Sequence, residues 1–161
     1  MSPEERLASL GLSLPEVVPP VAAYVPAVRS GALVFTSGQL PMAEGRMPAT
    51  GKVGAEVDPD DAKAMAQQCA LNALAAVKAE IGDLARVTRV VKVVGYVASA
   101  PDFTGQPQVV NGASELLQAV FGGAGVHARS AIGVVALPLD AAVEVELVVE
   151  VAPDGPSVHA L

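Results

Sequence analysis

Residues 127–151 read HARSAIGVVALPLDAAVEVELVVEV, two apolar runs joined by the segment LPLD. The first run opens on Arg129, and the second carries Glu144, Glu146 and Glu150 in one alternating phase. Alternation of apolar and polar residues with a period of two is typical of a strand with one buried face. The stretch therefore predicts two strands, and the short connection between them predicts that they pair as a hairpin.

The charges of this predicted hairpin have a definite geometry. A two-residue turn in LPLD places Glu144 opposite Gly133 and Glu146 opposite Ala131. Arg129 then points to the same side of the sheet, about 13 Å along the strands from Glu144. The plain alternative is the solvated face of an amphipathic hairpin. Because one small substrate would not reach both Arg129 and Glu144 in one chain, we expect a site between subunits.

The composition bounds the class of protein. A chain of 161 residues is long enough for one domain with a real core. Its hydrophobic fraction of 52% and mean hydropathy of +0.46 are high, yet the longest uncharged run is 14 residues, short of the roughly 20 of a transmembrane helix. We expect the surplus apolar surface to enter a subunit interface, with no membrane contact. The acidic N-terminus MSPEERLASL lacks signal-peptide features, which favours the cytoplasm.

The charge and the rare residue types exclude several kinds of site. A net charge of −7 and a pI near 4.7 repel phosphate backbones, and the absence of Trp leaves few stacking platforms, so we do not expect a nucleic acid partner. Cys69 is the only cysteine and is expected in the core. His127 and His159 are too few for a metal cluster. We therefore expect no metal site.

Two helices are predicted between the strands. Asp58-Pro59 resembles a helix start, with Asp58 as N-cap, and Gly82 ends a helix over 59–81. A second helix is predicted over 107–121, before a Gly-Gly pair. Each has apolar residues enough for one buried face.

Strands fill the rest of the predicted order. The β-branched segment 86–98 is one strand, and 21–30 and 32–40 form a hairpin. The order ββαβαββ predicts an α+β fold with two helices on one face of a mainly antiparallel sheet. We divide the chain into an N-terminal arm at 1–20, an α+β domain at 21–152 and a C-terminal tail at 153–161.

Two segments resemble known motifs but do not match them. The segment GRMPATGKV at 45–53 has five residues between its glycines, and Val stands where a phosphate-binding loop has Ser or Thr. Ser37 in FTSG lacks the glycine two residues earlier that a nucleophile elbow requires. The sequence argues against a nucleotide-binding loop and against a serine hydrolase.

Several strings together resemble a known family. YVPAV, FTSGQLP, VNGASELLQAVF and especially ARSAIGVVALPLDAAVEVEL are similar to the Rid (reactive intermediate deaminase) family, also called the YjgF family. The similarity covers about 20–152. It implies a chorismate-mutase-like fold and a homotrimer with three clefts between subunits. The arm and the loop at 41–58 exceed the compact family core, and we expect them to cover the cleft.

The resemblance also implies an activity, the hydrolysis of 2-imino acids such as 2-iminopropanoate to a 2-oxo acid and ammonia. Arg129 would hold the substrate carboxylate, for which its planar fork is suited. Glu144 would activate the attacking water, and the reaction would need no cofactor. Further matches to family pocket positions are Tyr24, Ser37, Gly38, Asn111 and the backbone N–H of Ala131.

Alternatives remain open for the residues and for the function. Because Glu146 and Glu150 share the phase of Glu144, all three could be ordinary surface residues. Ser37 could be a turn former. Gly133 stands where several relatives have Glu, which could enlarge the pocket. The family also includes non-catalytic members that bind small carboxylates and others described as endoribonucleases or translation inhibitors, and fold alone does not choose among these functions.

Overall fold

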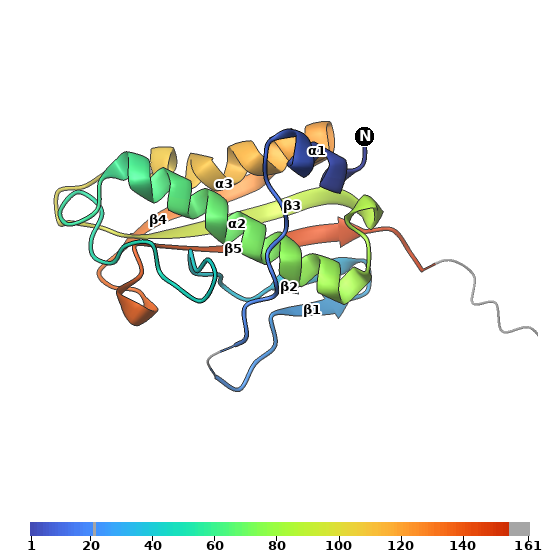
Figure 1. Cartoon of the computed structure of the whole chain (residues 1–161), viewed down its shortest axis with the longest axis horizontal. Helices are drawn as coiled ribbons and strands as arrows, with labels where there is room; N and C mark the ends of the chain where they lie inside the picture. The colour runs from blue at the N-terminus through green and yellow to red at the C-terminus, as the bar shows by residue number, and fades with distance from the viewer. Residues whose placement is uncertain (21, 155–161) are drawn as a thin grey trace, which may run out of the picture.

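The computed structural model describes residues 1–20 and 22–154 (Figure 1). The predicted tail at 153–161 therefore falls almost entirely outside the described residues, as does His159. In chain order the elements are α1 (Pro3–Ser9), β1 (Ala27–Ser30), β2 (Leu33–Thr36), α2 (Pro59–Ile81), η1 (Leu84–Arg86), β3 (Val87–Ala98), α3 (Gln106–Phe121), η2 (Gly122–Gly125), β4 (Ala128–Val134), η3 (Pro138–Asp140) and β5 (Val143–Val151).

The two long helices begin and end where the local signals predict. The Asp58 side chain accepts a hydrogen bond from the Asp60 N–H at 2.8 Å, Pro59 is the first residue of α2, and Gly82 follows its last turn. Helix α3 starts one residue before the predicted bound and ends before Gly122. Capping residues act within one turn of chain, which is why sequence alone locates these ends.

Helices α2 and α3 lie side by side on one face of the sheet (Figure 1). They approach closely at Gly112 of α3, where a Cβ atom would overlap the backbone carbonyl of Lys63 on α2. The alanine-rich side of α2 and the apolar side of α3 form the core with the inner face of the sheet. Cys69 is fully buried there, as predicted.

The sheet has five strands in the order β1-β2-β5-β3-β4. Strand β3 is antiparallel to β5 and parallel to β4, and the other neighbours are antiparallel. The predicted order ββαβαββ and the mainly antiparallel sheet are confirmed. The predicted hairpin of the last two strands is wrong, because β3 lies between β4 and β5.

The error in pairing has a physical cause. Helix α3 is the crossover between β3 and β4, and such a connection returns the chain so that the second strand runs parallel to the first. Strand β5 then fills the remaining place, between β2 and β3. The connection at 135–142 contains η3 and joins strands that are not neighbours. Glu144 is aligned with Tyr96 rather than with Gly133.

The true register also moves Arg129 to the other face of the sheet. Arg129 is aligned with Val93, and Val93 is buried on the side of the helices. Glu144 alternates with the buried Val143 and Val145 and so points to the face that no helix covers. The prediction that Arg129 and the glutamates share one face is therefore wrong.

The uncovered face of the sheet carries apolar side chains. Val28, Phe35 and Ile132 are 51%, 43% and 42% exposed. Val28 and Phe35 are aligned partners, and Phe35 is aligned with Val148 in the next strand. None of the helices in residues 1–20 and 22–154 has the length and apolar character needed to cross a bilayer.

The N-terminal segment is attached to the domain through α1. Ser2 and Glu5 form a reciprocal capping box, and Leu7 is buried in the core. Arg6 donates a hydrogen bond to the Val120 carbonyl at the end of α3. After α1 the chain runs without regular structure past α2 toward β1 (Figure 1).

Candidate active site

Arg129 lies on β4 with its side chain over α3. Its Nη1 atom donates hydrogen bonds to Asn111 Oδ1 at 2.7 Å and to Ser114 Oγ at 3.3 Å. Asn111 and Ser114 are three residues apart on α3, which places them on one side of that helix. The structure thus brings together Arg129 and Asn111, two of the residues singled out in the sequence.

His127 lies behind this contact. Its Nε2 atom is 2.9 Å from Ser114 Oγ, and its Nδ1 atom is 2.6 Å from the Gly125 carbonyl oxygen. Burial holds the pKa of His127 below its ordinary value, and the positive charge of Arg129 acts in the same direction, against the opposing effect of the Gly125 hydrogen bond. The imidazole is therefore neutral at pH 7.

Ala131 presents its backbone N–H at the free edge of the sheet. Strand β4 is the last strand, and the Val134 carbonyl accepts a hydrogen bond from the Ser99 N–H on the β3 side. The peptide groups of successive residues in a strand face alternate edges, so those of Ala131, three residues earlier, face outward. The N–H of Ala131 is thus available at the edge next to Arg129.

Glu144 lies half-buried on the uncovered face of β5, next to Glu146. Burial raises the pKa of Glu144 above its ordinary value, and the Glu146 carboxylate adds to the shift. Tyr96, aligned with Glu144 on β3, donates a hydrogen bond to Glu146 Oε1 at 3.0 Å. A carboxylate whose pKa is raised toward neutrality is a better proton acceptor in catalysis than an exposed one.

A β-bulge brings Gly38 against Glu144. Phe35 is aligned with Val148, but the next contact is between Gln39 and Val145, so one strand has an extra residue. A Cβ atom on Gly38 would lie 2.8 Å from Glu144 Cδ. The missing side chain at position 38 therefore gives the Glu144 carboxylate its space.

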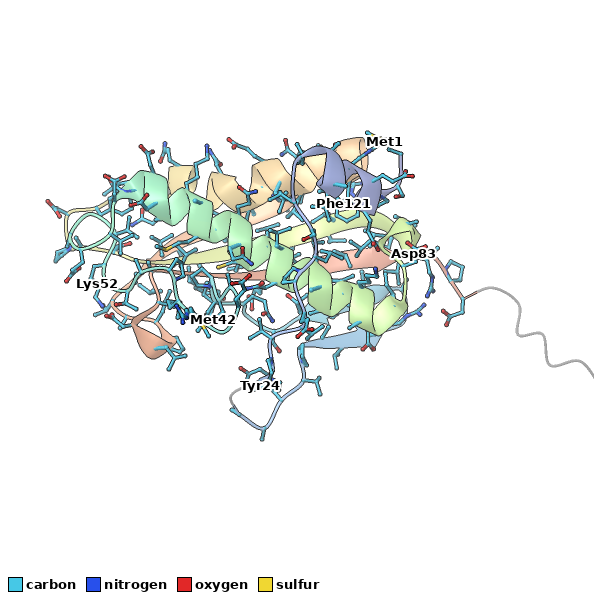
Figure 2. All side chains as sticks on the ribbon, in the orientation of Figure 1. Met1, Tyr24, Met42, Lys52, Asp83 and Phe121 are labelled. Atoms are coloured by element: carbon cyan, nitrogen blue, oxygen red, sulfur yellow. The ribbon has the colours of Figure 1, made fainter. Side chains whose placement is uncertain are left out.

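Ser37 links the bulge to the segment that carries Tyr24. Its hydroxyl donates to the Val25 carbonyl at 2.6 Å, and its backbone N–H donates to the Pro26 carbonyl at 2.8 Å. Tyr24 is 46% exposed and lies on a segment that projects from the body of the molecule (Figure 2). The single proton of the Ser37 hydroxyl is therefore used in the hydrogen bond that holds the segment carrying Tyr24.

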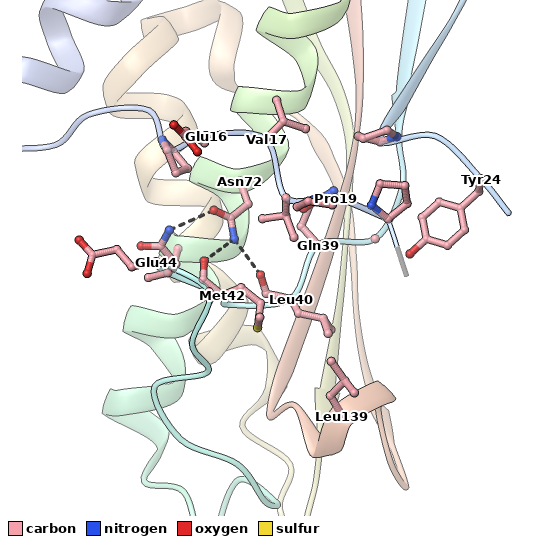
Figure 3. Close-up of a pocket in the computed structure, with 18 of the residues that line it drawn as sticks. Glu16, Val17, Pro19, Tyr24, Gln39, Leu40, Met42, Glu44, Asn72 and Leu139 are labelled. Carbon is pink, nitrogen blue, oxygen red and sulfur yellow. Dashed lines mark hydrogen bonds between the residues drawn. The ribbon is translucent and has the colours of Figure 1, made fainter. Parts of the chain in front are cut away.

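A pocket of about 630 Å³ opens beside the bulge (Figure 3). Its walls are the arm at 13–20, the loop at 38–45 and the inner side of α2, and both Tyr24 and Gly38 line it. At its base Asn72 Nδ2 donates to the carbonyls of Leu40 and Met42, each at 2.9 Å. The arm and the long loop therefore form a pocket that reaches two of the predicted site residues.

The predicted site residues fall into two groups in one chain. The arginine group consists of Asn111, Arg129 and Ala131, at the edge strand and α3. The glutamate group consists of Tyr24, Ser37, Gly38 and Glu144, around the bulge.

The two groups lie far apart in the fold. From Arg129 to Glu144 there are two strand spacings across the sheet and three residues along it, so their backbones are about 14 Å apart, and the side chains leave opposite faces. Neither group alone holds both charged residues that the predicted reaction needs.

Two features of the site differ from what the sequence predicts: the space at Gly133 and the role of Ser114. The space opposite Gly133 is not open, because a Cβ atom there would lie 2.7 Å from Gln106 Nε2. Gln106 is itself held by Ser99 and Phe103. Ser114 was missed, although its spacing of three from Asn111 on a helix was a usable signal.

Comparison with known proteins shows the family of this chain. A family model described as "YjgF/chorismate mutase-like, putative endoribonuclease" matches residues 4–151. The chain belongs to the YjgF family. Protein TCP17 of Trypanosoma cruzi is 45% identical over 146 residues, which cover 90% of this chain and 91% of TCP17. The resemblance to the Rid/YjgF family that the sequence indicates is therefore confirmed.

Solved structures of other proteins share the fold of this chain. A protein of unknown function from Agrobacterium tumefaciens superposes with a TM-score of 0.88 at 47% identity, covering 93% of this chain and 92% of that one. A protein from Shewanella oneidensis described as a putative endoribonuclease gives 0.91 at 32% identity, covering 94% and 100%. The YjgF/chorismate-mutase-like α+β fold is therefore confirmed.

Proposed function

We propose that this YjgF-family protein hydrolyses 2-imino acids to 2-oxo acids and ammonia, at a site formed by two subunits of a homotrimer. The observation that carries the proposal is the separation of the arginine group from the glutamate group within one chain. Each group contains one of the charged residues that the reaction needs. Bringing the Arg129 edge of one subunit to the Glu144 face of the next would complete the site.

The uncovered face of the sheet supports assembly of subunits. It exposes apolar side chains, among them Val28, Phe35 and Ile132, which a monomer would leave in water. The edge strand β4 also has backbone groups free for contacts. Both features support the proposed assembly of subunits.

The reaction uses few groups. Arg129 binds the substrate carboxylate, aided by the Ala131 N–H, and this fixes the imine carbon near Glu144 of the neighbouring subunit. Glu144 accepts a proton from water as the oxygen attacks the protonated imine carbon. The product of this attack is a carbinolamine, and protonated Glu144 returns its proton to the carbinolamine nitrogen. The carbon–nitrogen bond then breaks as ammonia leaves, and loss of the hydroxyl proton to solvent gives the 2-oxo acid. General-base catalysis of this kind contributes about 10²- to 10⁴-fold.

The pocket at the arm supports a substrate side chain longer than a methyl group. Its walls are largely apolar, and its charged residues are Glu16 and Glu44. We propose that substrates with an extended uncharged side chain are preferred over acidic ones. Rates with imino acids made in situ from alanine, methionine and glutamate test this preference, and an equal rate for all three would contradict it.

Ammonia release tests the proposed activity. A small amount of an amino acid oxidase generates 2-iminopropanoate, and the purified protein is expected to speed the appearance of ammonia. The Arg129→Ala variant is expected to lose this acceleration, and Arg46→Ala, in an exposed loop, is the matched control. No acceleration by the wild-type protein would contradict the proposal.

Two other functions follow from the family. A non-catalytic protein could bind a small carboxylate at Arg129, in which case pyruvate would raise the Tm without any turnover of the imine. An endoribonuclease, the description given to the Shewanella protein, would cleave RNA in an Arg129-dependent way. The net charge of −7 disfavours RNA binding.

A further inference from the structure

The hydrogen bonds of His127 define which of its nitrogens carries the proton. A carbonyl oxygen only accepts hydrogen bonds, so the contact of 2.6 Å to the Gly125 carbonyl requires a proton on Nδ1. In the neutral ring Nε2 is then an acceptor, and its partner at 2.9 Å is the Ser114 hydroxyl. Ser114 therefore donates its single proton to His127.

Arg129 is the next residue in this chain of hydrogen bonds. Because the Ser114 proton points to His127, the Ser114 oxygen is free to accept from Arg129 Nη1 at 3.3 Å. Nη1 carries two hydrogens, and the second one goes to Asn111 Oδ1 at 2.7 Å. Both hydrogens of Nη1 are used.

The remaining edge of the guanidinium stays free. Within residues 1–20 and 22–154, Nε and Nη2 of Arg129 make no hydrogen bond to protein. These two N–H groups point in parallel on one side of the guanidinium, which matches the spacing of two carboxylate oxygens. Fixing Nη1 thus selects the edge that a carboxylate can meet.

We propose that Ser114 and His127 are positioning residues, which together with Asn111 hold Nη1 of Arg129 so that its Nε–Nη2 edge receives the substrate carboxylate. This inference rests on the proposed carboxylate-binding role of Arg129. It assigns function to Ser114 and His127, which touch neither the proposed substrate nor Glu144.

The positioning works only while His127 is neutral. Protonation of Nε2 removes the acceptor for the Ser114 proton, and two cationic donors then converge on the Ser114 oxygen. Like charges at this distance repel each other, so the hold on Arg129 weakens. Carboxylate binding is expected to weaken as the pH falls through the pKa of His127.

Other charges around His127 do not replace this effect. On α3, Glu115 is next to Ser114, but it is exposed and paired with Lys63 of α2 at 3.1 Å. On β3, Lys92 is aligned with Ala128, the residue between His127 and Arg129. The charged group that acts on the pKa of His127 is Arg129 itself.

Pyruvate binding by the full-length protein tests the proposal, with pyruvate as the carboxylate probe. Its Kd is measured by calorimetry from pH 7.5 down to the pH at which NMR shows a doubly protonated His127 ring in the wild type. The proteins compared are wild type, Ser114→Ala, Ser114→Thr and His127→Phe. The matched control is Ser9→Ala, an exposed serine on α1. The 15N NMR signals of the His127 ring and of the Arg129 guanidinium are followed under the same conditions.

Distinct results support the proposal. Wild type is expected to bind pyruvate about 5-fold more weakly once His127 is protonated than at pH 7.5, the change that loss of one charge-assisted hydrogen bond produces. Ser114→Ala and His127→Phe bind about 5-fold more weakly at pH 7.5, without the pH step. Ser114→Thr keeps the hydroxyl and restores both the affinity and the step. In turnover, KM rises in Ser114→Ala while kcat stays unchanged.

Other results would overturn it. If Ser114→Ala binds pyruvate as wild type does at every pH, or if the His127 ring carries its neutral proton on Nε2, the positioning role is wrong although Arg129 binds the carboxylate. If wild type does not bind pyruvate while the NMR signals show the Nδ1–H form and a held Nη1, the proposed function fails and the hydrogen-bond chain stands alone, without the carboxylate role inferred for it.

Discussion

A Cβ atom on Gly38 would lie 2.8 Å from Cδ of Glu144, closer than two such carbons approach in proteins. The extra residue of the β-bulge puts Gly38 at this point, and the carboxylate of Glu144 occupies the space that a side chain would fill. Gly38, the last residue of the FTSG string, thus leaves the space that the carboxylate of Glu144, the proposed base, occupies.

Gly38→Ala is expected to displace the Glu144 carboxylate without unfolding the protein. The atoms met by the new methyl group belong to the mobile end of a side chain, which can turn away. We expect kcat for imine hydrolysis to fall by about 10²-fold, because a base moved by 1 Å is poorly placed. Steady-state kinetics and the Tm measure the two effects, and unchanged kcat would contradict the relation.

Glu144→Gln is expected to stabilise the protein while removing the activity. In the folded state burial and Glu146 raise the pKa of Glu144 above 4.5, so the ionised form costs stability at neutral pH. The neutral amide avoids this cost, and the Tm at pH 7.5 should rise by about 2 °C. The matched control is Glu150→Gln, in the same strand and phase.

The pH dependence of this difference follows from the sign of the shift. The protonated form of Glu144 contributes stability below the unfolded value of 4.5, and this contribution is lost as the pH rises through the higher folded pKa. The Tm advantage of Glu144→Gln should therefore shrink as the pH is lowered from 7.5 and vanish below about 4.5. A constant advantage across this range would contradict the raised pKa.

Arg129→Lys tests the fork of the arginine separately from its charge. A lysine keeps one positive charge but has a single nitrogen for both Asn111 and the substrate carboxylate. KM for 2-iminopropanoate is expected to rise at least about tenfold, with a smaller change in kcat. Wild-type KM in the lysine variant would show that charge alone is sufficient.

Asn72→Leu tests the base of the pocket. Asn72 is buried, and its amide satisfies the carbonyls of Leu40 and Met42. Leaving these two partly buried acceptors without their donor should lower the free energy of unfolding by about 1 to 3 kcal/mol. Gln68→Ala removes only the contact to Asn72 Oδ1 and should cost less. Urea unfolding compares the two variants, and equal losses would contradict this role.

Local features of the sequence were sufficient for the helices. Asp58, Pro59 and Gly82 set the ends of α2 through contacts within one turn, so their meaning does not depend on the rest of the fold. The order of the strands depends instead on which edge each strand joins after α3, which no local pattern contains. This is why the charges of β4 and β5 were assigned to one face, when they lie on two.

The candidate site could be found only in part for the same reason. The resemblance to the family pointed to Arg129 and Asn111, and the structure places Arg129 Nη1 2.7 Å from Asn111 Oδ1. It also pointed to Gly38 and Glu144, which lie side by side. His127 had been considered only as a metal ligand, since its contact with Ser114 depends on how α3 packs on β4. Side chains that act through others leave little trace in a single sequence.

Mixed trimers test most directly whether Arg129 and Glu144 of different subunits complete one site. Arg129→Ala and Glu144→Gln subunits with different tags are co-expressed, and assemblies that contain both are isolated by two affinity steps. In a cyclic trimer of either mixed composition, one of the three clefts combines an intact arginine with an intact glutamate.

These mixed assemblies are therefore expected to release ammonia from 2-iminopropanoate at about one third of the wild-type rate, although each variant alone is inactive. Activity no higher than that of the single variants would contradict a site shared between subunits.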